Sequence, residues 1–202
     1  TYNRLPSYVS VTTWSSIINS SDEGSSAVSL AAVSSEGSST SSEISFTTEQ
    51  IICAAYKVKT YTEKYNNLPG YVIIGDTKVT MPQFLELMTD NLLAISNGSE
   101  TSHTLGDVAE PTDLNQSLET GTLSKTEYID VAKTINLYIS SNDKAPGYVS
   151  TSLGNMRYET MVYSYAKILN FYKSYDRLPN TVSVTQWGTT ETSQTTESSS
   201  TT

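Results

Sequence analysis

Apolar side chains recur at helical spacing in four stretches of this chain, and polar runs separate the stretches. One series, Ile52, Ala55, Val58 and Tyr61, returns at a constant offset of 77 positions as Ile129, Ala132, Ile135 and Tyr138. Each series predicts the apolar face of an amphipathic helix. Two further helices are expected, one with Met81, Phe84, Leu85, Met88, Leu92 and Ile95 on one side and one from about Met156 to Tyr175.

Capping signals define the ends of the two duplicated helices. Thr47 with Gln50, and Ser124 with Glu127, have the spacing of a capping box, in which a hydroxyl and a side chain three positions later satisfy each other's backbone groups. Both helices stop at an Asn or Asp, which tolerates left-handed backbone, and a proline follows that cannot continue a helix.

A Leu-Pro-x-Tyr-Val motif, or a variant of it, follows the helical stretches and gives the chain its repeats. We call each copy an arm; the copies span 2–14, 66–72, 143–149 and 175–187. After the second arm, two β-branched runs at 71–74 and 78–80 surround a Gly-Asp-Thr turn, which predicts a small hairpin. An offset of 33 also carries the helix and arm pattern at 129–146 onto 162–179, so the unit is one helix followed by one arm.

The expected fold is therefore mainly α. Four amphipathic helices form a bundle built from two helical hairpin repeats, with short β-hairpins or extended arms. This repeat domain spans 46–187, with halves at about 46–98 and 123–187, and a long loop at 99–122 stands where an arm is expected. Residues 15–45 and 188–202 are Ser/Thr-rich and read as linkers, and 1–14 reads as the terminal arm of a preceding unit.

Composition excludes several classes of function. Twelve basic against 21 acidic residues give a net charge of -9, which repels a phosphate backbone, so no nucleic-acid partner is expected. The single cysteine, Cys53, cannot form an intrachain disulfide, and no His/Cys cluster has metal-ligand spacing, so we expect no metal and no cofactor. No run is long enough to span a membrane. His103, the only histidine, lies in the long loop without a nucleophile beside it and is expected to be solvated, so no catalytic residue and no enzyme activity are predicted.

One stretch, 51–88, carries a pattern of spaced residues that is specific as a set. Its members are Ala54, Ala55, Val58, Tyr61, Asn66, Leu68, Pro69, Tyr71, Val72, Val79, Met81, Phe84 and Leu85. With this pattern the chain resembles the pseudomurein-binding repeat of methanogenic archaea. The resemblance implies an extracellular, non-catalytic protein at the cell surface or in the cell wall.

The arms supply the candidate contact residues for a wall ligand or a neighbouring unit. These are Leu5, Tyr8, Pro69, Tyr71, Pro146, Tyr148 and Leu178. Tyrosine rings stack on sugar faces while their hydroxyls form hydrogen bonds, but the same rings can pack an arm against a helix end, and both interpretations stay open. Candidate N-glycosylation sites are Asn19, Asn97 and Asn115, each in an Asn-x-Ser pattern.

Two functions remain open. The first is a structural module of an extracellular archaeal filament, stalk or adhesin, in which neighbouring copies of the repeat join head to tail, because open head-to-tail contacts propagate. The alternative is a pseudomurein-binding module that anchors an attached adhesin or wall hydrolase to the cell wall. Purified wall material distinguishes the two, since only the second requires binding to it.

Overall fold

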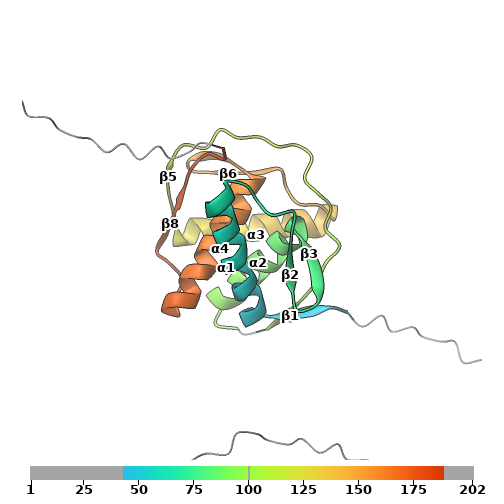
Figure 1. The fold of residues 1–202 in the computed structure, drawn as a ribbon. Helices are drawn as coiled ribbons and strands as arrows, with labels where there is room; N and C mark the ends of the chain where they lie inside the picture. Colours follow the sequence, from blue (N-terminus) through green and yellow to red (C-terminus); the bar gives the residue numbers. More distant parts are fainter. Residues whose placement is uncertain (1–42, 100, 189–202) are drawn as a thin grey trace, which may run out of the picture. The chain divides into compact units, whose positions relative to one another are not determined.

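The computed structural model describes residues 43–99 and 101–188 of the 202-residue chain (Figure 1). The predicted terminal arm at 1–14 and most of both predicted linkers lie outside the described residues, and with them Leu5, Tyr8 and Asn19. The domain boundaries therefore stay a prediction.

Two halves with the same order of elements make up the described part. The first half contains β1 (Ser45–Thr47), α1 (Thr48–Tyr65), β2 (Tyr71–Ile74), β3 (Thr77–Thr80), α2 (Met81–Ser96) and β4 (Ser102–Thr104). The second half contains β5 (Gly121–Ser124), α3 (Lys125–Asn142), β6 (Tyr148–Thr151), β7 (Gly154–Arg157), α4 (Tyr158–Tyr175) and β8 (Thr181–Val184). Four packed helices with short two-stranded sheets confirm the predicted fold class.

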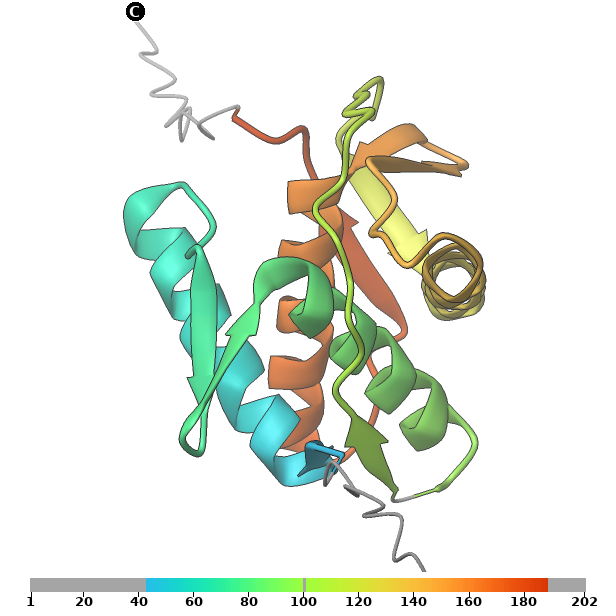
Figure 2. The ribbon, with the colours of Figure 1, turned by 90° about the vertical axis from the view of Figure 1, so that its right-hand side faces the viewer.

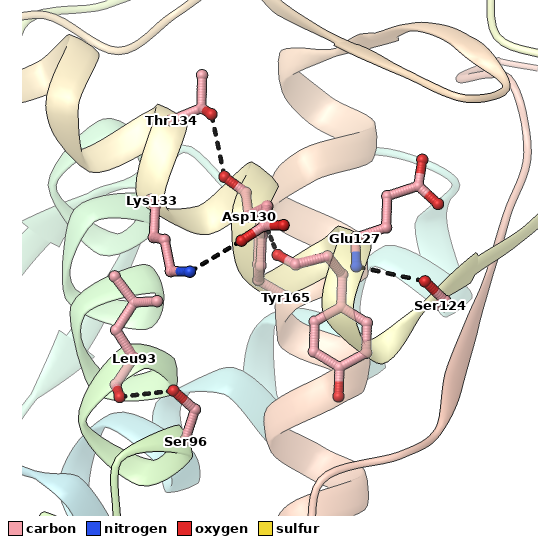
Figure 3. A network of polar contacts seen from close by, with 9 residues as sticks. Leu93, Ser96, Ser124, Glu127, Asp130, Lys133, Thr134 and Tyr165 are labelled. Carbon is pink, nitrogen blue, oxygen red and sulfur yellow. Dashed lines mark hydrogen bonds and ion pairs between the residues drawn. The ribbon is translucent and has the colours of Figure 1, made fainter.

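The first predicted capping box is present, and the second forms only in part. The Thr47 N–H donates to Gln50 Oε1 at 2.9 Å, and the Gln50 N–H donates to Thr47 Oγ1 at 3.4 Å. At α3, Ser124 Oγ accepts from the Glu127 N–H at 3.3 Å (Figure 3). The Glu127 carboxylate instead accepts from the Ser152 N–H at 2.8 Å, so it ties the start of α3 to the β6–β7 turn.

Left-handed residues end three of the helices and turn the chain into the arms. Asn66, Asp143 and Asp176 have φ angles of 50°, 49° and 51°, and each backbone N–H closes the last helical turn at 2.8 Å. Asn and Asp adopt this conformation at lower cost than other residues with a Cβ, and the proline that follows each one prevents further helix. The predicted stops at Asn66 and Asp143 are confirmed.

Helices of one half pack mainly against helices of the other half. The main contacts join α1 to α4 and α2 to both α3 and α4 (Figures 1 and 2). Helices α1 and α4 run antiparallel, because Tyr163 hydrogen-bonds Glu63 near one end of the pair and Lys173 contacts Cys53 near the other. Side chains without exposure on these helices include Phe84, Leu85, Met88, Leu92, Met161 and Leu169. The halves therefore share one core.

Two strand pairings that the sequence analysis missed close the halves. Strand β1 pairs antiparallel with β4, and β5 with β8, so each half is clasped by the strand before its first helix and the strand after its second. His103 lies in β4 opposite Phe46 and is buried, so the expectation of a solvated loop histidine is wrong. Burial lowers the pKa of its imidazole, because desolvation disfavours the charged form.

The apolar face predicted for α1 and α3 was also partly wrong. Tyr61 and Tyr138, the last members of their series, are 41% and 37% exposed, whereas Thr62 and Ile139 are buried. A step of three residues falls short of a full helical turn, so a series of three such steps rotates halfway around the helix. The two tyrosines therefore lie at the surface.

A pair of buried tyrosines fixes the last arm. Tyr165 on α4 donates to the Tyr128 carbonyl at 2.9 Å, and the Tyr128 hydroxyl donates to the Pro179 carbonyl at 2.6 Å. Burial raises the pKa of Tyr128 to about 12, so the phenol keeps its proton at neutral pH.

Replacing Tyr128 with Phe tests this connection. The Tyr128→Phe variant leaves the buried Pro179 carbonyl without its donor, so we expect a loss of about 1–2 kcal/mol in the free energy of unfolding. Urea denaturation measures it. Tyr175→Phe, at an exposed ring on α4, is the control; equal stability of Tyr128→Phe and wild type would contradict the assigned role.

Acidic groups between α2 and α3 predict a dependence of stability on pH. Burial raises the pKa of Glu86, with the nearby Asp90 and Asp143 carboxylates adding to the shift, and burial also raises the pKa of Asp90. Asn136 donates a hydrogen bond to Asp90. Because these folded-state pKa values lie above the unfolded ones, the folded chain binds more protons, and their contribution to stability grows as pH falls toward the unfolded values.

The Asp90→Asn variant isolates that contribution. It removes a desolvated charge and its repulsion of Glu86, so we expect it to be more stable than wild type at pH 7 and the difference to shrink toward about pH 4. Thermal unfolding at a series of pH values measures the difference, and the His103 contribution cancels because both proteins contain it. A difference that stays constant with pH would count against this explanation.

Candidate functional site

A hollow of ≈ 530 Å³ lies where the arm of the second half leaves α3. Three segments form it: the second half of α3, the arm together with β6, and the long loop that precedes β5. Its lining residues are Thr112, Asp113, Thr134, Tyr138, Pro146, Gly147, Tyr148, Val149 and Ser150. This volume is in the range of about 300–1,000 Å³ that small-molecule sites occupy.

Two tyrosine rings give the hollow its apolar surfaces. Tyr138 comes from α3 and Tyr148 from the first position of β6, and their side chains are 37% and 40% exposed. Rings of this kind offer a flat face for stacking and a hydroxyl for hydrogen bonding. The pair is suited to a ligand with both apolar faces and hydroxyl groups.

The long loop forms one wall because backbone hydrogen bonds hold it against the second half. Near the arm, the Ala109 N–H donates to the Asp143 carbonyl at 2.9 Å, and the Ala145 N–H donates to the Ala109 carbonyl at 3.1 Å. Nearer β7, the Glu119 N–H donates to the Leu153 carbonyl at 2.7 Å. Figure 2 shows the loop running from β4 past the helices to the β6–β7 hairpin.

Gly147 permits the close approach of the loop to the arm. A Cβ atom at this position would lie 2.3 Å from the Asp113 carbonyl oxygen, which is far inside van der Waals contact. The corresponding glycine of the first half, Gly70, has open space around it. The same motif position therefore holds a loop in one half and faces open space in the other.

The polar groups of the hollow are mostly hydroxyls, with one carboxylate at the exposed Asp113. Thr134 Oγ1 donates to the Asp130 carbonyl at 3.0 Å (Figure 3), and Ser150 Oγ donates to Asn155 Oδ1 at 2.9 Å, so both oxygens keep lone pairs that can accept from a ligand. Lys144 Nζ donates to Thr112 Oγ1 at 3.2 Å at the loop. Such a surface favours a polyhydroxylated or amide-containing ligand.

The structure brings together only some of the predicted contact residues. Pro146 and Tyr148 line the hollow, whereas Leu178 is buried in the core. Pro69 is half-buried and Tyr71 is exposed on the arm of the first half. Both predicted glycosylation sites in the described part, Asn97 and Asn115, are exposed, which leaves their modification a prediction.

Sequence reasoning missed Tyr138 and the loop residues as parts of the site. The signal for Tyr138 was present, because its distance of ten positions from Tyr148 is repeated between Tyr61 and Tyr71. Tyr61 and Tyr71 are both exposed on the first half, where Lys78 Nζ lies 4.4 Å from the centroid of the Tyr71 ring. The first half therefore presents the same pair of rings without the loop as a wall.

Other chemistry is limited in the part of the chain that the structure describes. Among these residues, no group of three or more His, Cys, Asp or Glu side chains is placed to hold a metal ion. No helix of the described ranges is long and apolar enough to cross a membrane.

The described part is thus a helical domain built from two repeats, with an aromatic hollow in the second. Residues 119–151 match the family model of the pseudomurein-binding repeat. The chain thus contains a pseudomurein-binding repeat, which confirms the resemblance and associates the chain with the cell wall. No match was found among curated proteins.

The matched segment contains most of the hollow. It spans β5, α3 and β6, and so includes Thr134, Tyr138 and the arm residues 146–150. The matched segment is the second copy of the repeat, whereas the residues that carry the resemblance in the sequence lie in the first copy, at 51–88. The family signature and the hollow therefore coincide.

Substituting the two equivalent glycines tests how the hollow is built. Gly147→Ala forces the loop away from the arm, so we expect a loss of about 1–3 kcal/mol in stability and faster hydrogen exchange at the Ala109 and Ala145 amides. Gly70→Ala, which meets open space, is the matched control and should change stability by less than about 0.5 kcal/mol. Similar behaviour of the two variants would argue against a wall formed by the loop.

Proposed function

We propose that this chain is a non-catalytic module that binds pseudomurein and anchors an attached protein to an archaeal cell wall. The observation that carries the proposal is the coincidence of the matched repeat with the hollow that contains Tyr138 and Tyr148. A wall polymer is bound through its repeating saccharide and peptide units, which need stacking surfaces and hydrogen-bonding groups rather than a nucleophile.

The family match supports this wall-binding reading better than the filament or stalk reading. The predicted head-to-tail contacts involve the arms and the linkers at 15–45 and 188–202, and most of both linkers lies outside the described residues. Assembly with neighbouring copies, an extracellular location and glycosylation of Asn97 or Asn115 accordingly stay predictions. The net charge of -9 is unfavourable for an anionic polymer at long range, so the contacts within the hollow must provide the affinity.

Binding to purified pseudomurein sacculi, measured by co-sedimentation over a range of wall concentrations, tests the proposal. We expect Tyr148→Ala to weaken binding roughly threefold to tenfold, because it removes one stacking ring from the hollow. Tyr138→Ala should have a similar effect. Leu137→Ala is the matched control, because this neighbour on α3 is exposed and does not line the hollow.

Three results would contradict the proposal. One is the absence of sedimentation of the folded wild type with sacculi, and another is the same affinity for Tyr148→Ala, Leu137→Ala and wild type. The third is equal binding to walls that contain no pseudomurein. Circular dichroism of each variant shows whether its fold is retained, so that loss of binding is not confused with unfolding.

A further inference from the structure

A second groove, separate from the hollow, lies between α1 of the first half and α4 and the chain end of the second. Its volume is ≈ 580 Å³, and it shares no lining residue with the hollow. We call it the C-terminal groove; it is bounded by the last turn of α1, the first turns of α4 and the chain that follows β8. The lining residues are Thr62, Glu63, Asn66, Thr160, Tyr163, Ser164, Lys167 and 183–188.

An aromatic residue stands on each side of this groove. Trp187 is half-buried, and Gln116 of the long loop fixes its backbone: the Trp187 N–H donates to Gln116 Oε1 at 2.8 Å, and Gln116 Nε2 donates to the Trp187 carbonyl at 3.2 Å. Tyr163 on α4 donates its hydroxyl to Glu63 at 3.1 Å. The Tyr163 side chain and the Trp187 backbone are therefore held in place before any ligand binds, which lowers the entropic cost of binding.

Two buried hydroxyl groups on α4 point to a ligand. Thr160 and Ser164 are one helical turn apart, only 2% and 3% exposed, and neither hydroxyl oxygen has a hydrogen-bond partner among the described residues. The facing Thr62 is satisfied, because its hydroxyl donates to the Val58 carbonyl at 2.8 Å. Buried hydroxyls are rarely left unpaired, and both Thr160 and Ser164 line the C-terminal groove.

The first half shows how the fold satisfies the same position internally. Gln83 on α2 corresponds to Thr160 on α4, and its Nε2 donates to the Gly106 carbonyl in the long loop at 2.8 Å. Further along the same loop, Ala109 pairs with Lys144, which follows the end of α3. In the second half, residues 185–188 after β8 are equivalent to the start of the loop after β4. They line the C-terminal groove, together with the end of α1. The Thr160 hydroxyl, at the position equivalent to Gln83, therefore lacks among the described residues the kind of partner that the loop gives Gln83.

Charges in the C-terminal groove balance and are already engaged. Glu63 pairs with Lys59 at 2.8 Å in addition to accepting from Tyr163. Lys167 donates to the Ser183 carbonyl, and its Nζ lies 4.6 Å from the centroid of the Tyr163 ring. A ligand with a net charge would find no complementary partner here, whereas a neutral one with several hydroxyls would.

We infer that the C-terminal groove is a second binding site, which takes a neutral saccharide between Tyr163 and Trp187. The sugar ring packs between the two aromatic side chains, and its hydroxyls pair with Thr160 and Ser164. This site goes beyond the proposed wall binding at the hollow, because it uses different residues and does not require pseudomurein as its ligand.

Trp187 fluorescence tests the inference directly. The chain has two tryptophans, so a Trp14→Phe background assigns the emission to Trp187. Titration with cellobiose and with N,N′-diacetylchitobiose should give a saturable change in emission for at least one of them, with a dissociation constant on the order of 1 mM. The dissociation constant should not change with salt, because a neutral ligand is not screened.

Variants in the same background separate stacking from folding effects. Tyr163→Ala should weaken binding by about tenfold, whereas Tyr163→Phe keeps the ring and should retain most of the affinity. Ser164→Ala should weaken binding roughly threefold or more, because it removes one hydroxyl partner. Leu137→Ala, which lies in neither cavity, should bind as the background protein does.

Several outcomes would overturn the inference. No saturable change with either disaccharide up to about 50 mM would do so, as would equal affinity of Tyr163→Ala and the background protein. A strong dependence on salt would exclude a neutral ligand. Emission that depends on protein concentration without added sugar would show that a second copy of the chain occupies the groove instead.

Discussion

Mutual burial of helix faces between the two halves is the constraint on which the described structure depends. Each half contributes two helices, yet the main helix contacts join α1 to α4 and α2 to α3 and α4, across the boundary of the repeat. Side chains of the shared core such as Phe84 and Met88 have no exposure. Burial of such side chains contributes about 1.5–3 kcal/mol each, so the contacts between the halves are expected to stabilise both.

Left-handed residues end three of these helices, and those helix ends carry the arms. Residues Asn66, Asp143 and Asp176 turn the chain in the same left-handed conformation, so equal arms emerge at equivalent places. Their surroundings differ: the arm after α3 is backed by the long loop, whereas the arm after α1 is open at Gly70. Duplication thus provided copies of one aromatic surface, and the loop made one copy into a hollow.

The sequence predicted what is local, and it failed where distant segments meet. Helix positions, the Thr47 cap and the β2–β3 hairpin follow from spacing and turn chemistry within a few residues. The β1–β4 and β5–β8 pairings join short strands more than fifty residues apart, and three- or four-residue strands carry too little pattern to be found. The sequence predicted only part of the site. Tyr148 was predicted from its motif, whereas Asp113 lies at the hollow because of the path of the long loop, which no local signal in the sequence indicates.

The most direct test of the central claim, that a wall polymer occupies the hollow of the second half, is amide hydrogen exchange of the whole chain, free and bound to sacculi. The account predicts slower exchange on binding at 134–138 and 146–150 and in the loop at 112–113, which together line the hollow. Unchanged exchange in these segments while the chain is fully bound, with protection elsewhere, would contradict it.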